Sequence, residues 1–201
     1  IGGHFHVDQW VDFWILVGLR KFLGLAFVGE RIDPNYLRFQ VQKQVEKYCQ
    51  YVEKGLEVRP LFSLHFTHPN ELLLDKVYQL KSGLIFHMIQ SKVGKYHLKS
   101  IMHSYLKANC TTKELIPLFK KHCGINLKEF SKTWIYGIGA PFLHCSFEHN
   151  RKNNSLDLKL TQTPLFQNYL ASPANSQFPH LSDSNYRIPF RLNLMRFYTG
   201  P

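Results

Sequence analysis

The apolar positions of this chain repeat with a helical period up to about residue 141 and with a strand period beyond it. In the first part, long segments carry an apolar residue every three or four positions, which is the pattern of amphipathic helices packed on a core. Beyond residue 141, apolar and polar residues alternate, as in strands with one buried face. The pattern predicts an α+β chain, with a helical domain over 1–141 and the beginning of a β-domain over 142–201.

Three long helices are predicted in the first part. The first covers residues 12–25. The second covers 34–54, because Asp33-Pro34 is a helix N-cap followed by proline at the first helical position, and Gly55 suits its end. The third covers 73–92 and is closed by Gly94. The second helix has an apolar stripe with spacings of four, four, three and four, which we expect to be core: Leu37, Val41, Val45, Tyr48 and Val52.

Shorter elements follow. Thr111-x-x-Glu114 is a capping box that opens a helix ending at Gly124, and Asn126-x-x-Glu129 is expected to cap the next helix in the same way. After residue 141, two alternating segments around a turn at 150–154 predict a β-hairpin. Residues 163–185 are rich in Pro, Ser and Asn and are expected to form a loop, and 186–198 one further strand.

The composition adds limits to this picture. With 201 residues and 44% hydrophobic content, the chain can bury a sizeable core. It begins at Ile1 rather than Met, so we expect a fragment on which targeting signals cannot be judged. The apolar run over 13–28 is interrupted by Arg20 and Lys21 and is too short to span a bilayer. The cysteines show no CxxC spacing and are expected to be isolated buried thiols: Cys49, Cys110, Cys123 and Cys145.

The net charge of +11 is concentrated in one block. Residues 81–132 hold ten lysines against only Glu114 and Glu129, whereas residues 1–80 hold equal numbers of basic and acidic side chains. Such a block is typical of a surface that faces a polyanion, although a solvated lysine face without a partner has the same pattern. The candidate DNA-binding residues are Lys92, Lys95, Lys99, Lys113, Lys120, Lys121, Lys128 and Lys132.

The first predicted helix carries a pattern with chemical meaning. Its two aromatics, short apolar run, glycine and further aromatic are similar to the zinc-binding helix of the gluzincin aminopeptidases, W-L-x-E-G-x-A-x-F/Y. Val17 stands where this family has its third zinc ligand, a glutamate. An isopropyl group has no donor atom for zinc, so the resemblance implies a scaffold without its metal site. The positions that match the family are Trp14, Ile15, Gly18 and Phe22.

A second catalytic position is also changed. The segment around Lys81 is similar to the peptidase segment Y-x-K-G-A-x-V-L-x-M-L, and alignment on Lys81 and Met88 puts Gln79 in place of the family's tyrosine. In the family that tyrosine donates a hydrogen bond to the oxyanion of the tetrahedral intermediate. Tyr78 is one residue away, which turns a side chain about 100° around a helix, so we expect it to face elsewhere.

A third landmark follows in the family's order. The segment from Phe130 to Leu143 is similar to the passage in which the aminopeptidases leave their helical subdomain and enter a β-sandwich, with one extra residue between Phe130 and Trp134. Over about residues 1–160, the resemblance therefore implies a thermolysin-like helical aminopeptidase subdomain followed by the start of a β-sandwich.

Within this superfamily, the chain most resembles the branch found in TFIID as TBP-associated factors, whose scaffold has lost its zinc site. Segments 10–23, 59–89 and 134–162 carry this resemblance. It implies a nuclear scaffold without enzymatic activity, metal or cofactor, which aids recognition of core-promoter (initiator) DNA and transcription initiation by RNA polymerase II. The implied partners are other TFIID subunits and promoter DNA, with no membrane and no small-molecule substrate.

Two other functions stay open at this point. A divergent zinc aminopeptidase would need a replacement ligand, for which His4 and His6 are nearby candidates, although surface or packing histidines fit these positions better. By the family's spacing, two of its zinc ligands would precede Ile1. The remaining alternative is a pseudo-peptidase binding module outside transcription.

Overall fold

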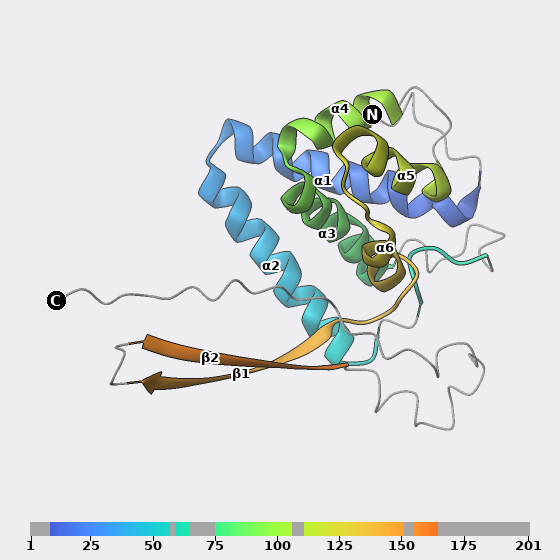
Figure 1. The fold of residues 1–201 in the computed structure, drawn as a ribbon. Coiled ribbons are helices and arrows are strands. Elements are labelled where there is room, and N and C mark those ends of the chain that lie inside the picture. The colour runs from blue at the N-terminus through green and yellow to red at the C-terminus, as the bar shows by residue number, and fades with distance from the viewer. Residues whose placement is uncertain (1–8, 57–58, 65–74, 106–110, 151–154, 165–201) are drawn as a thin grey trace. The chain divides into compact units, whose positions relative to one another are not determined.

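The computed structural model describes residues 9–56, 59–64, 75–105, 111–150 and 155–164. It divides the chain into two compact units, Ile1–Ile138 and Gly139–Pro201. The described part of the first unit is helical, and that of the second is a β-hairpin (Figure 1). The elements are the 3-10 turn η1 (Trp10–Asp12), α1 (Phe13–Arg31), α2 (Pro34–Glu53), α3 (Lys76–Val93), α4 (Lys95–Tyr105), α5 (Thr112–Cys123), α6 (Lys128–Trp134), β1 (Pro141–Asn150) and β2 (Ser155–Pro164).

Helices α1 and α3 form the centre of the helical unit. Trp14 and Phe86 are stacked with their ring centroids 5.7 Å apart, and Phe22 contacts the same ring at 6.2 Å. Gly18 lies where the helices cross, because a Cβ added there would be 2.5 Å from the carbonyl oxygen of Ser82. Any larger residue at this position would push the two helices apart.

Helix α1 is longer than the sequence predicted, since it continues past residue 25 to Arg31. Gly29 lies inside the helix and does not end it. A Cβ on Gly29 would be 2.7 Å from the Cβ of Leu37, so this glycine permits the close approach of α1 and α2. The predicted helix end at residue 25 was therefore wrong, and Gly29 serves close packing inside the helix.

Helix α2 begins and ends as predicted. The Asp33 carboxylate accepts a hydrogen bond from the backbone N–H of Asn35 at 3.0 Å, and Gly55 follows the helix with a φ of 67°. The expected core stripe is only partly correct. Tyr48 and Val52 are buried, but Val45 is 43% exposed. Leu37 and Val41 are half-buried, so the described neighbours of α2 cover the stripe at both ends and leave Val45 exposed.

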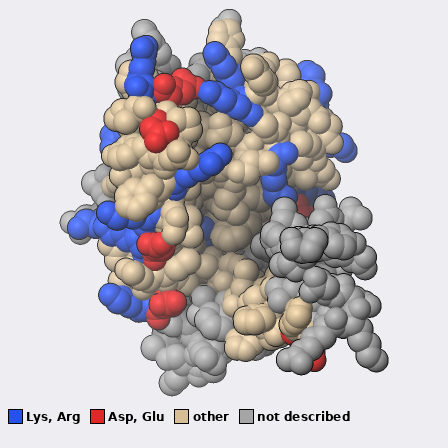
Figure 2. All heavy atoms as spheres, turned by 90° about the vertical axis from the view of Figure 1, so that its left-hand side faces the viewer, with Lys and Arg blue, Asp and Glu red and all other residues tan. Residues whose placement is uncertain are grey.

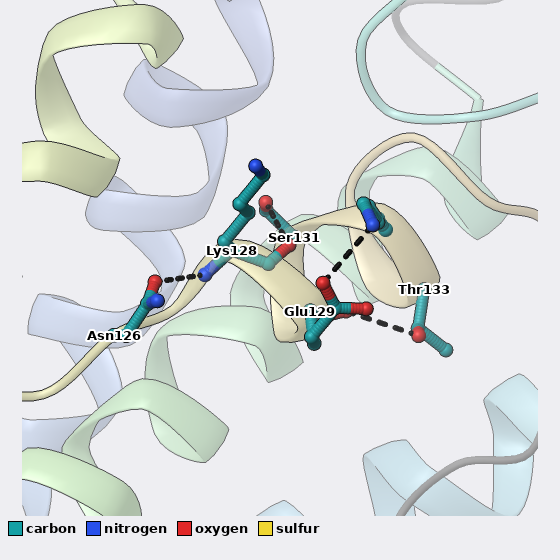
Figure 3. A network of polar contacts seen from close by, with 6 residues as sticks. Asn126, Lys128, Glu129, Ser131 and Thr133 are labelled. Atoms are coloured by element: carbon teal, nitrogen blue, oxygen red, sulfur yellow. Dashed lines mark hydrogen bonds and ion pairs between the residues drawn. The ribbon is translucent and has the colours of Figure 1, made fainter.

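The two shorter capped helices differ from each other. Thr111 Oγ1 accepts a hydrogen bond from the N–H of Glu114 at 3.3 Å, as the predicted capping box requires. Before α6, Asn126 Oδ1 accepts from the N–H of Lys128 at 2.9 Å, and Glu129 pairs with Lys132 at 3.0 Å (Figure 3). Asn126 thus binds the start of α6 as predicted, but the full capping box is not formed, because Asn126 accepts from Lys128 and not from Glu129, and the N-cap residue is Leu127.

The β-hairpin is confirmed as an antiparallel pair in which Cys145 faces Leu160 and Phe147 faces Leu158. Strand β2 continues to Pro164, so the first residues of the predicted loop 163–185 belong to a strand. The turn 151–154, the rest of the loop and the predicted strand 186–198 lie outside the described residues.

Of the cysteines, Cys49 and Cys123 are half-buried and Cys145 is exposed, all three as free thiols, whereas Cys110 is not among the described residues.

None of the described helices is both long and apolar enough to cross a membrane.

Candidate functional site

The α1–α3 crossing brings Val17 and Gln79, the two positions that the resemblance to aminopeptidases predicts to be altered, to one side of the helix pair. Gly18 lies against Ser82, and the Lys21 Cβ lies 3.2 Å from where a Cβ on Gly83 would be. The two helices thus run in the same direction where they cross. Val17 lies one turn before Lys21 on α1, and Gln79 lies one turn before Gly83 on α3. Both side chains are half-buried.

Tyr78, the neighbour of Gln79, points into the core. Its side chain is 8% exposed, and its hydroxyl donates to the carbonyl of Leu61 at 3.4 Å. Burial, with a smaller contribution from the Asp12 charge, raises the pKa of the Tyr78 hydroxyl well above its ordinary value. The group is therefore a neutral donor held inside the helical unit.

The side chains at the altered positions do not suit a divalent metal ion. Val17 offers no donor atom, and one helical turn further along α1 is the ammonium of Lys21. Burial, then the charges of Arg20 and Lys47, lower the pKa of Lys21. In the described ranges, no group of three or more His, Cys, Asp or Glu residues is placed to hold a metal. His4 and His6 lie outside those ranges.

A buried polar network that the sequence did not reveal joins the start of α1 to the start of α5. Asp12 is 2% exposed, and its carboxylate accepts hydrogen bonds from the backbone N–H of Thr112 at 2.8 Å and from the Thr112 hydroxyl. The indole N–H of Trp14 donates to the same hydroxyl at 2.9 Å. A carboxylate at a helix N-terminus is favourable because the free N–H groups there carry partial positive charge. The two partners are about a hundred residues apart in sequence, so no local signal connects them.

Lys81, used above only to align the sequence, is also a structural residue. It is 2% exposed, and its ammonium donates to the carbonyl of Gly137 at 2.8 Å. The carbonyl of Ile135 accepts hydrogen bonds from the N–H groups of Leu61 and Phe62. The segment that follows α6 is thus tied to α3 and to the segment around residue 61.

The eight candidate DNA-binding lysines are all exposed and are distributed over four helices, namely α3, α4, α5 and α6. Lys95 pairs with Glu30, and Lys132 pairs with Glu129. The Lys92 ammonium lies 6.0 Å from the centroid of the Phe130 ring, which brings the end of α3 beside α6. Among the described residues, the other lysines of the set have no ion-pair partner: Lys92, Lys99, Lys113, Lys120, Lys121 and Lys128.

The charges on one face of the molecule are mixed. Figure 2 shows Lys and Arg side chains at several separate places on this face, with Asp and Glu side chains between them. Among the described residues of this face, the positive charges therefore offer separate point contacts to a polyanion and form no continuous basic patch.

Comparison with known proteins extends this picture, although no family model matches the chain. The chain is 23% identical over its whole length to transcription initiation factor TFIID subunit 2 of Schizosaccharomyces pombe. It is 22% identical over 77% of its length to the protein of the same name from Danio rerio, and 21% identical over 77% to that from Gallus gallus. The chain spans only 18% of the length of the S. pombe protein and 16% of the D. rerio protein.

A solved structure supports the fold. The crystal structure of Legionella pneumophila aminopeptidase A in complex with aspartic acid matches with a TM-score of 0.62 and 19% identity, over 80% of this chain and 18% of the aminopeptidase. This likeness confirms the predicted fold class, a peptidase-like helical subdomain followed by the start of a sheet domain. The chain is therefore similar in sequence to TFIID subunit 2 proteins and similar in fold to an aminopeptidase.

Proposed function

We propose that this chain is part of a non-catalytic scaffold subunit of the nuclear transcription factor TFIID. Its role is to help TFIID recognise core-promoter DNA at the initiator and so to support transcription initiation by RNA polymerase II. The similarity to TFIID subunit 2 proteins over 77% to 100% of the chain supports membership in this complex. The partners proposed on this basis are other TFIID subunits and promoter DNA, without a membrane or a small-molecule substrate.

The single observation that carries the non-catalytic assignment is the side of α1 around Val17. The close packing of α1 on α3 at Gly18 keeps the helix pair in place, while the zinc-ligand position holds an isopropyl group. The next turn of the same helix adds the Lys21 ammonium, and a fixed positive charge opposes the binding of a divalent cation. Gln79, the proposed replacement of the tyrosine, lies on the same side, which supports the proposal that both catalytic functions are lost.

The DNA-binding role is proposed for the lysines of α3 to α6. Lysine offers a point charge on a flexible stem, which suits a phosphate oxygen and does not read a base edge by a two-pronged contact. Contacts of this kind position a protein on DNA without choosing the sequence. We therefore assign sequence selection at the initiator to other parts of TFIID.

A divergent zinc aminopeptidase is the competing function, because the aminopeptidase fold is present. The intact protein should be measured for bound zinc by elemental analysis and for hydrolysis of amino-acid arylamides. We expect no stoichiometric zinc and no turnover. Val17→Glu alone should not create activity, because Gln79 still replaces the tyrosine. One equivalent of zinc together with turnover that a chelator abolishes would refute the proposal.

A further inference from the structure

Lys21 lies with its stem against the backbone of α3. Its Cβ and Cδ are 3.2 and 3.8 Å from the position that a Cβ on Gly83 would take, so the absence of a side chain at Gly83 makes room for it. The side chain is half-buried between two helices and carries a charge at its end. Placing an ammonium there removes part of its water shell, which is costly unless an anion replaces it.

The positive charges near Lys21 have no negative partner in the described part of the chain. Arg20 precedes it in α1, and Lys47 of α2 is close enough to act on it electrostatically. Neither described salt bridge involves any of these three residues. Glu30 pairs with Lys95, and Glu46, which precedes Lys47, accepts a hydrogen bond from the Gln42 amide and is in no ion pair among the described residues. Three cations are therefore gathered where α1, α2 and α3 meet.

Apolar side chains lie on the same flanks of α1 and α2 as Lys21 and Lys47. Val17 is four residues before Lys21 and Val28 is seven residues after it, so all three share one flank of α1. Both valines are half-buried. Tyr36 is eleven residues before Lys47, about three helical turns, so these two share one flank of α2. Tyr36 is 40% exposed. The mixed surface, which we call the cationic flank, consists of Arg20, Lys21, Lys47, Val17, Val28 and Tyr36.

We propose that the cationic flank is a docking site for an acidic protein segment that carries apolar side chains between its carboxylates. Such a segment supplies counter-ions for the three cations and covers the apolar side chains at the same time. A DNA backbone would satisfy the cations only and would leave the valines and the tyrosine facing phosphates and water. This site is separate from the lysines proposed to contact DNA and does not depend on the proposed function.

The experiment is lysine footprinting of the intact protein with an amine-acetylating reagent under single-hit conditions, read by mass spectrometry. The probe is a blocked peptide of alternating glutamate and leucine, and a parallel sample receives duplex DNA. We expect the peptide to reduce acetylation of Lys21 and Lys47 several-fold and to leave Lys54, an exposed lysine after the end of α2, unchanged. The DNA is expected to protect Lys92 and Lys99 and to leave Lys21 unchanged.

A matched pair of variants completes the test. Lys21→Gln should weaken peptide binding about fivefold, in the range of partly exposed charge pairs, and Lys54→Gln should leave it unchanged. Protection of Lys21 by DNA but not by the peptide, or no protection by either, would overturn the docking site. Protection of Lys21 by the peptide without any protection of Lys92 and Lys99 by DNA would leave the docking site standing and count against the DNA-binding role.

Discussion

His87 on α3 is a histidine enclosed by the helical unit. Its ring meets the Phe22 ring edge to face, with centroids 4.8 Å apart, and its Nε2 is buried without a hydrogen-bond partner among the described residues. Burial lowers the pKa of His87 from 6.5 to about 4. The folded protein therefore keeps this ring neutral at a pH where the unfolded chain would protonate it.

This burial makes stability depend on pH. Above pH 6.5 the ring is neutral in both states, and between pH 6.5 and about 4 only the unfolded state takes up the proton, so stability falls as the pH is lowered through this window. The expected loss is on the order of 2 kcal/mol. In urea unfolding of the intact protein at several pH values, His87→Phe should have a flatter profile than the wild type. His103→Gln, at an exposed position on α4, should keep the wild-type profile, and equal profiles for all three proteins would contradict the prediction.

Val17 and Lys21 differ in how much of their environment the sequence predicts. That Val17 cannot bind zinc follows from residue chemistry, since no packing gives an isopropyl group a donor atom. The environment of Lys21 does not, because it depends on Gly83 of α3 and Lys47 of α2, which only the fold brings near it.

Two aspartates that precede helices differ in how much they stabilise the fold. Asp33 and Asp12 both precede helices and both accept hydrogen bonds from backbone N–H groups. Asp33 caps its own helix and is exposed, whereas Asp12 caps the distant helix α5 through Thr112 and is buried. Removing a buried acceptor leaves its donors unpaired away from water, which costs more than losing an exposed cap.

The paired variants Asp12→Ala and Asp33→Ala test this difference. We expect Asp33→Ala to lower the free energy of unfolding by about 1 kcal/mol. Asp12→Ala should lower it by about 3 kcal/mol, because the Thr112 N–H and hydroxyl lose their partner and α5 loses its attachment to α1. Urea denaturation of the intact protein measures both. Equal losses would show that the Asp12 network is not a significant tie between the helices.

For the whole molecule, the lysines of α3 to α6 predict how DNA binding responds to salt. Each phosphate contact releases counter-ions, so neutralising one lowers the slope of log affinity against log salt by about one. The double variant Lys92→Gln/Lys99→Gln should lower the slope by about two and weaken binding equally on promoter and unrelated DNA. Lys54→Gln is the matched control, and its slope should equal that of the wild type. An unchanged slope in the double variant would make these lysines a solvated surface.

Much of this protein followed from the sequence alone. The helical part, the helix starts at Asp33 and Thr111, the β-hairpin and the lack of a zinc-donor atom at Val17 all depend on short-range patterns, in which spacing and residue chemistry suffice. Only the tertiary structure showed that Gly29 continues a helix, that Asp12 holds Thr112 and that Lys21 gathers with Lys47. Those features depend on which distant segments pack together. Burial and charge interactions between such segments produce no periodic pattern in the sequence.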